Sequence, residues 1–406
     1  MKKRFELDFL GQFYASTLNE KHSGIFSITV YLKENLNRKI LKQAMVEILK
    51  RFPFLSGGLR HNFFWYEYEI TNNPLPLIPI KGVPPLKNNE QIFRVLYDSR
   101  HLILEVNHLL CDGRTLSRIA KELLMCYFEF LGVRFDDNNE SISSKISCEE
   151  ELENSYLRFI KFTDENVKTY KKKSQLKISA YRPPISEHAP IQMLTYQLSA
   201  NKIKETAKLN QTTISGLLLS LIFKSVSIER GTLEHKEPIV ISVPVDCRSF
   251  FPSKTMRNFV TAQNIIMPEV ENSSVMIKEI QGALEKIDKN SVYTKFREHQ
   301  KMYQAMRYVP RKIKDLLVKK IAKNEFSEHT TGFSNIGKID FPKNIAEKID
   351  SMTFFAETDG ISPYFFSCIT TGDVLTLSVA LKTENKILIG ALENNLMPFL
   401  QTSGNK

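Results

Sequence analysis

The residues that could do chemistry in this sequence gather between Leu102 and Ala120, in the stretch LILEVNHLLCDGRTLSRIA. Leu102, Leu104, Val106 and His108 alternate, so in a strand they share one face and the histidine points where the apolar side chains point. An imidazole at the exit of a buried strand is held rigidly, as a general base at the rim of a pocket must be. His108 is therefore the candidate catalytic base, the alternative being a histidine satisfied within the core.

Asp112 follows His108 and opens a predicted helix. It can orient His108 directly, as in a catalytic triad, or it can lock the loop by pairing with an arginine elsewhere in the chain. Because Gly113 permits a sharp turn directly after it, the second role is favoured. A metal site with His108 and Asp112 as ligands lacks further ligands nearby, so no metal is predicted. Cys111 as a nucleophile is disfavoured, since a lone cysteine between Leu110 and Asp112 is typical of packing.

Hydrophobic periodicity predicts the elements that position this motif. The run IFSITVYLK from Ile25 alternates as a strand does, and Asn37 can cap the helix that follows it. The strand before His108 is the second half of a hairpin that turns at Asp98-Ser99-Arg100, and the apolar spacing after Gly113 predicts a helix.

The second half of the chain repeats this alternation of strands and helices without repeating the sequence. Two long amphipathic helices are predicted between Ser273 and Lys323, and strands are predicted over SMTFFAET, YFFSCITT and VLTLSVAL, the last two joined by a Gly372-Asp373 hairpin turn. The proline-containing segment YRPPISEHAP, at 181–190, is the predicted domain boundary. The expected architecture is α/β with mixed sheets, in an N-terminal domain at 1–183 and a C-terminal domain at 184–406.

Composition limits the class of protein. The chain has 406 residues, a net charge of +11 and 5 cysteines without a C-x-x-C pair, which predicts neither a disulfide framework nor a zinc finger. The lysines are dispersed and no nucleic-acid-binding motif accompanies them, so the charge by itself does not choose among nucleic acid, lipid, anionic cofactor and simple solubility. Acidic residues interrupt the basic N-terminus, and the apolar run from Ile214 to Val226 is too short to cross a bilayer. We expect a cytoplasmic protein with no membrane span and no nucleic-acid partner.

The motif NHLLCDG, Asn107 to Gly113, resembles the active-site motif of the chloramphenicol acetyltransferase-like superfamily, which includes alcohol acyltransferases, polyketide-associated acyltransferases and peptide-synthetase condensation domains. Three further stretches are similar to that superfamily in order and spacing: RFPFLSGGLR at 51–60, VPVDCRSFFP at 243–252 followed by NFVTAQN, and FSNIGKI at 333–339, which is similar to its crossover strand. The resemblance covers nearly the whole chain.

The resemblance implies two sheet-and-helix domains with an active-site tunnel between them, and a thioester donor and an acceptor that enter from opposite sides. It implies that His108 deprotonates the acceptor and that Asp112 holds the loop through an arginine, with Arg60 the favoured partner and Arg248 the second choice. Arg60 as a surface arginine and Arg248 paired with Asp246 are the alternatives. An oxyanion needs a hydrogen-bond donor, for which Ser334 and Asn335 on the crossover-like strand are candidates, unless the backbone satisfies them.

Departures from the family's patterns narrow the expected reaction. Asn107 stands where condensation domains commonly have a second histidine, which disfavours peptide-bond formation, and the D-F-G-W-G signature of plant-type acyltransferases is missing. We therefore predict a monomeric acyltransferase that esterifies an alcohol with an acyl group from coenzyme A, as cosubstrate, or from a phosphopantetheinyl acyl-carrier protein. The alternatives are an amide-forming condensation enzyme acting on an amine and a catalytically silent relative that binds an acyl group or a carrier protein.

Overall fold

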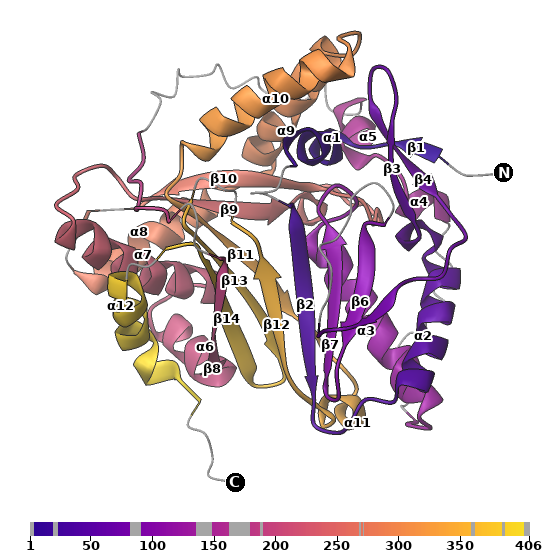
Figure 1. The fold of residues 1–406 in the computed structure, drawn as a ribbon. Helices are drawn as coiled ribbons and strands as arrows, with labels where there is room; N and C mark the ends of the chain where they lie inside the picture. Colours follow the sequence, from indigo (N-terminus) through magenta and orange to yellow (C-terminus); the bar gives the residue numbers. More distant parts are fainter. Residues whose placement is uncertain are drawn as a thin grey trace.

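The computed structural model describes residues 4–18, 23–81, 91–134, 148–161, 179–186, 190–267, 269–270, 272–358, 362–383 and 386–401. Their strands form three sheets, of five, six and three strands. The two larger sheets lie next to each other, and helices cover their outer faces (Figure 1). This is the mixed α/β architecture that the sequence predicts.

The five-stranded sheet carries the motif and has the order β12-β2-β7-β6-β5. Its strands are β2 (Ile25–Leu32), β5 (Leu77–Pro79), β6 (Phe93–Tyr97), β7 (His101–Asn107) and β12 (Ile349–Ala356). β6 and β7 form the predicted antiparallel hairpin. The helices α2 (Arg38–Arg51) and α3 (Gly113–Phe130) pack against each other, and α3 also contacts β2 and β7. Both begin where the sequence predicts, because Asn37 caps α2 and Asp112 caps α3 through the backbone N–H of Thr115.

The strand that crosses between the two large sheets is β12. Its residues pair antiparallel with β2 from Ile349 opposite Leu32 to Ala356 opposite Phe26, although β12 lies more than three hundred residues later in the chain. The stretch FSNIGKI, which is similar to a crossover strand, instead lies in β11 (Thr331–Lys338) and stays in the six-stranded sheet, where it runs parallel to its neighbours. That prediction is wrong, because the crossing is made one strand later. The boundary at 183 stays a prediction, although the first sheet draws β12 from beyond it.

The six-stranded sheet has the order β10-β9-β11-β13-β14-β8. Its other strands are β8 (Gln192–Ser199), β9 (Val240–Asp246), β10 (Val260–Ile266), β13 (Tyr364–Thr371) and β14 (Val374–Leu381). The helices beside it are α6 (Ala200–Leu209), α7 (Ile214–Thr232), α8 (Ser273–Glu285) and α12 (Lys386–Leu396). β13 and β14 form the predicted hairpin, with Thr371 opposite Val374 across the Gly372-Asp373 turn.

Three helices lie above both sheets in Figure 1: α1 (Phe9–Thr17), α9 (Lys289–Ala305) and α10 (Arg311–Phe326). Two helices are predicted between Ser273 and Lys323, but three form, because Asp288 closes a capping box at the start of α9 and Pro310 separates α9 from α10. The remaining elements are the three-stranded sheet of β1 (Arg4–Glu6), β3 (Gly57–His61) and β4 (Tyr66–Ile70), the short helices α4 (Cys148–Glu151), α5 (Ser155–Lys161) and α11 (Lys343–Ala346), and the 3-10 turns η1 (Pro53–Leu55), η2 (Cys247–Ser249) and η3 (Met397–Phe399).

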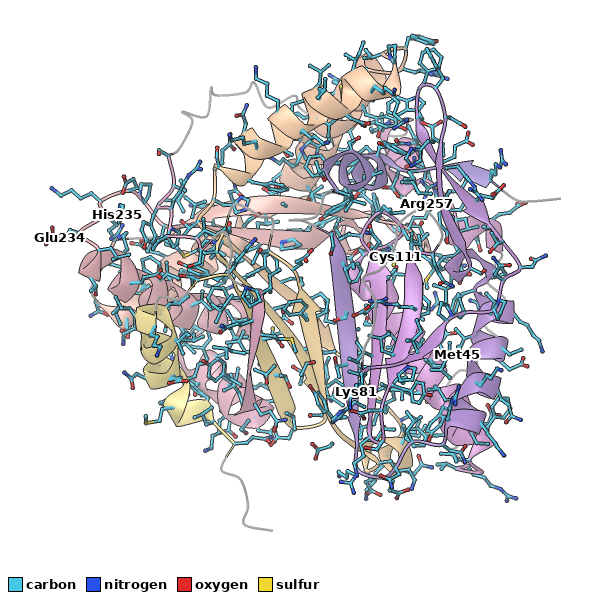
Figure 2. The ribbon with its side chains drawn as sticks, in the orientation of Figure 1. Met45, Lys81, Cys111, Glu234, His235 and Arg257 are labelled. Atoms are coloured by element: carbon cyan, nitrogen blue, oxygen red, sulfur yellow. The ribbon has the colours of Figure 1, made fainter. Side chains whose placement is uncertain are left out.

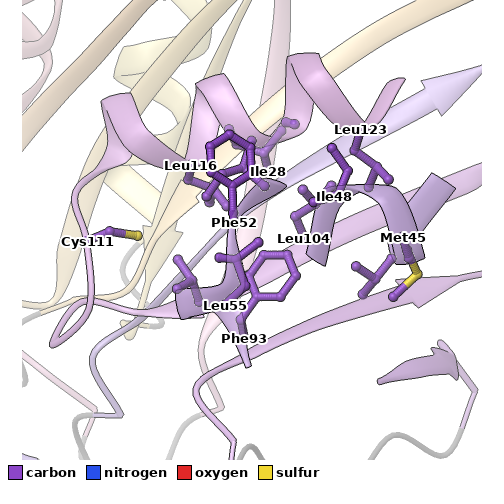
Figure 3. Packing of buried hydrophobic residues seen from close by; sticks show 14 of the residues in the cluster. Ile28, Met45, Ile48, Phe52, Leu55, Phe93, Leu104, Cys111, Leu116 and Leu123 are labelled. Atoms are coloured by element: carbon purple, nitrogen blue, oxygen red, sulfur yellow. The ribbon is translucent and has the colours of Figure 1, made fainter. Parts of the chain in front are cut away.

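Buried apolar side chains form two large clusters, one for each of the larger sheets. In the first, Leu116 and Leu123 of α3 pack with Ile48 of α2 and Leu104 of β7 (Figure 3). A third, smaller cluster is rich in aromatic rings and includes Phe259. It lies between α5, η2 and α9, and so supports the segment that reaches the motif from the second half of the chain.

Within the described residues, no single helix is long and apolar enough to span a membrane. The pair α6 and α7 reaches that length and composition only when both helices are counted, and the pair bends by 92° at its junction.

Gly113 permits a close approach between the two halves of the chain, and its substitution tests this packing. A Cβ atom at this position would lie 2.8 Å from Cγ2 of Ile336 on β11 and 3.3 Å from the ring of Phe354 on β12. We expect Gly113→Ala to lower the free energy of unfolding by about 1–3 kcal/mol, as overpacking does. Gly282→Ala is the matched control, because Gly282 lies in α8 with no neighbouring heavy atom within 4 Å. Helix propensity predicts that this control is neutral or stabilising by up to roughly 1 kcal/mol, and chemical denaturation measures both.

Candidate active site

His108 lies one residue beyond the end of β7 and is held from several sides. Its backbone N–H donates to the carbonyl of Gly24 at 2.8 Å. Its ring stacks on Tyr14 with a centroid distance of 4.4 Å and an angle of 13°, and it contacts Phe26 at 4.8 Å. Tyr14 comes from α1, which can approach the loop closely because Gly11 has no side chain. A Cβ atom at Gly11 would lie 2.6 Å from the carbonyl oxygen of Leu109. The imidazole is therefore rigid, as the sequence predicts for a general base.

The side chain of Asn258 determines which nitrogen of His108 carries the proton. Nδ2 of Asn258 donates to the backbone carbonyl of His108 at 2.9 Å, and Oδ1 lies 3.1 Å from Nδ1 of the same residue. The carbonyl can only accept, so the amide nitrogen must face it and the amide oxygen must face the ring. Nδ1 of the neutral ring therefore donates to Oδ1, and the basic lone pair is on Nε2.

Asp112 is buried, and within the part of the chain that the structure describes it forms no hydrogen bond with His108. Its Oδ1 caps α3, while Oδ2 accepts from the backbone N–H of Phe259 at 3.0 Å and from Arg248 at 2.8 Å. Burial raises the pKa of Asp112, but the Arg248 guanidinium and these hydrogen bonds outweigh it, so the pKa lies below its ordinary value. Of its two predicted roles, the structure shows the loop lock and not the direct orientation of His108.

The arginine that locks Asp112 is Arg248, the second choice at the sequence level. Arg60, the favoured partner, is half exposed on β3 and pairs with Glu69 at 2.6 Å, so its predicted pairing with Asp112 is wrong. The reason is topological: Arg60 is held by its antiparallel neighbour strand β4, on which Glu69 lies opposite Gly58, whereas η2 brings Arg248 to the motif. The predicted alternative pair of Arg248 and Asp246 also forms, at 2.9 Å.

The clamp segment, Cys247–Phe259, connects the second half of the chain to the motif through several bonds. Arg248 also donates to the carbonyls of Thr255 and Arg257, which fixes the shape of the segment itself. Arg257, labelled in Figure 2, donates to the carbonyl of Glu6 at 2.8 Å and pairs with Asp8, the N-cap of α1, at 3.4 Å. The clamp segment therefore holds both the His108 loop and the helix that carries Tyr14.

Two cavities meet at His108. The narrow cavity, of about 190 Å³, lies under α1, α9 and α10 and is lined mainly by apolar side chains such as Phe13, Met302 and Val318. The wide cavity, of about 610 Å³, lies between the two large sheets and includes Asp112, Arg114 and Lys338 in its lining. Six residues line both cavities: Tyr14, His108, Pro244, Val260, Ala262 and Phe326. The imidazole thus borders both cavities.

The predicted oxyanion candidates Ser334 and Asn335 lie on β11 and line the wide cavity together with His108. The amide of Asn335 has partners within the protein, since Nδ2 donates to Ser215 at 3.0 Å and Oδ1 accepts from the backbone N–H of Gly337 at 2.8 Å. These bonds favour Ser334 over Asn335, and the oxyanion role of either residue stays a prediction.

Cys111 does not line either cavity. It is fully buried beside α3 in the first apolar cluster (Figure 3), and burial raises the pKa of its thiol well above the ordinary value. A nucleophilic thiolate is therefore disfavoured there. Among the residues that the structure describes, no three His, Cys, Asp or Glu side chains gather in a way that could hold a metal ion.

Asn258 and Tyr14 contact His108 in the candidate site, and sequence reasoning missed both. Asn258 opens the stretch NFVTAQN, and that resemblance was the available signal, but spacing cannot show that it contacts a residue 150 positions earlier. No sequence pattern relates Tyr14 to His108, because their stacking follows from the packing of α1.

Solved structures with the same fold extend over nearly the whole chain, whereas scans of protein-family models and of curated proteins give no match. Polyketide synthase associated protein 5 from Mycobacterium tuberculosis aligns with a TM-score of 0.66 at 12% identity, over 98% of both chains. The epimerization domain from the third module of tyrocidine synthetase B aligns with a TM-score of 0.61 at 13% identity, over 98% of this chain and 95% of that one. The condensation domain from Monacolin K polyketide synthase aligns with a TM-score of 0.59 at 12% identity, over 97% and 96%.

These alignments confirm the fold that the motif NHLLCDG suggested. The chain has the same fold as these condensation and epimerization domains, with two sheet-and-helix lobes. At such low identities the likeness concerns the fold alone, and the reaction has to be argued from the side chains.

The role of Arg248 can be tested against that of Arg60. We expect Arg248→Met to lower the free energy of unfolding by about 3–5 kcal/mol, because Asp112 would remain buried without its cation. Arg60→Met should cost no more than about 1 kcal/mol, since Arg60 is half exposed and Glu69 keeps its bond to Arg4. Denaturant titration of both variants measures the difference. Equal losses in the free energy of unfolding would contradict the role of Arg248 in holding the loop through Asp112.

The same ion pair predicts a direction for the pH dependence. The pKa of Asp112 in the folded chain lies below its ordinary value of 3.8, so the pair's stabilisation is complete above that value and is lost as the pH falls through the folded pKa. In the Arg248→Met variant, the free energy of unfolding should therefore fall less steeply as the pH decreases through this range.

The tautomer of His108 can be tested with Asn258→Ala. In the original protein the ring ¹⁵N spectrum of His108 should show the Nδ1-protonated neutral form, because Oδ1 of Asn258 accepts that proton. The variant should show a mixture of tautomers. An unchanged spectrum in a folded variant would mean that another group selects the tautomer.

Proposed function

We propose that this chain is an acyltransferase that moves an acyl group from a thioester to an alcohol hydroxyl, with His108 as the general base. The observation that carries the proposal is the position of His108 where two cavities meet, with its proton held on Nδ1 by Asn258. A base with its lone pair on Nε2 suits the removal of a proton from a hydroxyl group in the cavity.

In the proposed step, Nε2 of His108 takes the proton of the acceptor hydroxyl as its oxygen attacks the thioester carbonyl carbon. The tetrahedral intermediate then expels the thiolate, which takes the proton back from the imidazolium. The products are an ester and a free thiol, and His108 returns to its starting state. Ser334, on the wall of the wide cavity, is the proposed hydrogen-bond donor to the oxyanion.

The two cavities differ in a way that supports an assignment of the substrates. We propose that the wide cavity receives the thioester arm of coenzyme A or of a phosphopantetheinyl carrier protein, because it is the larger of the two and its lining includes Arg114 and Lys338. These cations pair with Asp246 and Asp340 in this structure and would exchange those partners for the phosphate groups of the donor. The narrow cavity suits an apolar chain. We propose that the enzyme works as a monomer and acts in the cytoplasm.

The fold by itself does not exclude related reactions, since the aligned structures include condensation and epimerization domains. Asn107 supports the ester over the amide product, because it stands where condensation domains commonly have a second histidine. It is buried, and its Nδ2 donates to the backbone carbonyl of Ser23 at 2.7 Å while its Oδ1 accepts from the backbone N–H of Leu109. These bonds give it a structural role in the loop. A silent relative that only binds an acyl group or a carrier protein is the remaining alternative, and activity measurements distinguish it.

The decisive measurement is the release of free thiol from a panel of acyl-CoA donors with mixed alcohols and amines as acceptors. His108→Ala should lower the acceptor-dependent rate by roughly 10²–10⁴-fold, the usual contribution of a general base. His101→Ala is the matched control, because His101 lies at the far end of the strand that leads to His108, is 41% exposed at its side chain, and pairs with Asp98. This control should keep the full rate.

Each other outcome has a separate meaning. Release that is insensitive to His108→Ala would contradict the role of His108 as the base. A preference for amines would replace the ester with an amide product. If acyl-CoA donors give no release, the same panel loaded on carrier proteins is tested, and failure there would favour the silent relative.

A further inference from the structure

A group of large apolar side chains lies exposed over the narrow cavity. This roof surface consists of Phe63, Phe64, Tyr308, Ile313, Leu316 and Leu317. Exposure reaches 70% for Phe63, 79% for Tyr308 and 69% for Leu316. Contiguous apolar patches on a protein surface commonly mark a binding site.

The roof surface is assembled from three segments that are bonded to one another. The backbone N–H of Arg311, at the start of α10, donates to the carbonyl of Phe63 at 2.9 Å. Nζ of Lys314 donates to the carbonyl of Phe64 at 2.7 Å. The ring of Phe64 contacts the rings of Phe63 and Tyr308 at 4.8 Å and 6.4 Å. The tip of the β3–β4 hairpin, the turn before α10 and the first half of α10 thus form one surface, at the top of Figure 1.

The apolar residues of α10 are not explained by packing within the chain. The helix buries Lys314, Val318 and Ala322 on one face. Ile313, Leu316 and Leu317 lie on another face at helical spacing and remain 53%, 69% and 43% exposed. A helix that exposes three such side chains in a stripe is typical of a surface that meets an apolar environment.

The charges around the stripe are mostly positive. Lys312, Lys319, Lys320 and Lys323 are exposed on α10. Between positions 307 and 323 the only acidic residue is Asp315, which pairs with Arg311 at 3.4 Å. A second copy of this surface would bring like charges together, whereas an anionic surface would complement them.

The narrow cavity lies against the inner side of the same segments. Trp65 follows the exposed phenylalanines of the hairpin, and Met306 and Lys314 come from the segments that carry Tyr308 and Leu316. The cavity continues from there to His108. A lipophilic molecule held at the roof surface would therefore have a short apolar path to the candidate base.

We propose that the roof surface binds the surface of an anionic lipid bilayer. The apolar stripe and the aromatic tips enter the interface between headgroups and acyl chains, and the lysines contact the anionic headgroups. The bound protein takes a lipophilic substrate from the bilayer into the narrow cavity. This last step rests on the proposed acyltransferase function, but the binding to the bilayer does not.

The test is flotation of the full chain with vesicles of phosphatidylglycerol and phosphatidylcholine, without any acyl donor. The chain should float with these vesicles, less so as salt is added, and weakly with phosphatidylcholine alone. The double substitution Leu316→Ser, Leu317→Ser should reduce binding roughly tenfold, because two apolar side chains would no longer leave water. The double substitution Lys319→Glu, Lys320→Glu should also reduce binding, but only to the anionic vesicles.

The matched control is Leu209→Ser with Met397→Ser, two residues that are 84% and 63% exposed. Leu209 ends α6 and Met397 directly follows α12, and both helices lie far from α10 in Figure 1. The control should bind as the original chain does. Equal losses of binding in the control and test variants would overturn the proposal. Failure of the unsubstituted chain to float would also overturn it, as would binding of the roof surface to an acidic carrier protein and not to vesicles. Because no reaction is measured, a failed acyltransferase assay and a failed flotation remain distinguishable.

Discussion

The ion pair between Asp112 and Arg248 is the interaction on which the site depends. It joins residues 136 positions apart, and both side chains are almost completely buried. A buried carboxylate without a cation is costly, so the loop that carries His108 can adopt its shape only when the clamp segment is in place. The same carboxylate accepts the backbone N–H of Phe259 and caps α3, which means that one group connects a helix, a loop and the second half of the chain.

The clamp segment positions the ring of His108 as well as the ion pair of Asp112 with Arg248. Asn258, next to the backbone group that Asp112 accepts, bonds both to the carbonyl and to the ring of His108. A shift of the clamp would therefore alter the tautomer of His108 and the position of its loop together. This arrangement resembles the division of labour in a catalytic triad, but here the carboxylate holds the loop and an amide orients the imidazole.

The likeness to condensation and epimerization domains shows how little the reaction depends on the overall fold. The two lobes and the crossing strand β12 create a space between two sheets, and the side chains that line it decide what happens there. In this chain the wide cavity on one side of His108 is lined by charged side chains of both signs, whereas the narrow cavity on the other side is lined mainly by apolar ones. That difference supports an ester of an apolar acceptor more directly than the fold does.

What the sequence by itself determined was local: the β6–β7 hairpin, the N-caps of α2 and α3, and the emergence of His108 from a buried strand, because alternation, turn residues and caps act between neighbours in the chain. It also indicated that Asp112 pairs with an arginine. Only the tertiary structure decided that the arginine is Arg248 and not Arg60, that Asn258 orients the ring, and that β12 makes the crossing. These contacts join positions far apart in the chain, and no local periodicity reports which distant segments a fold brings together.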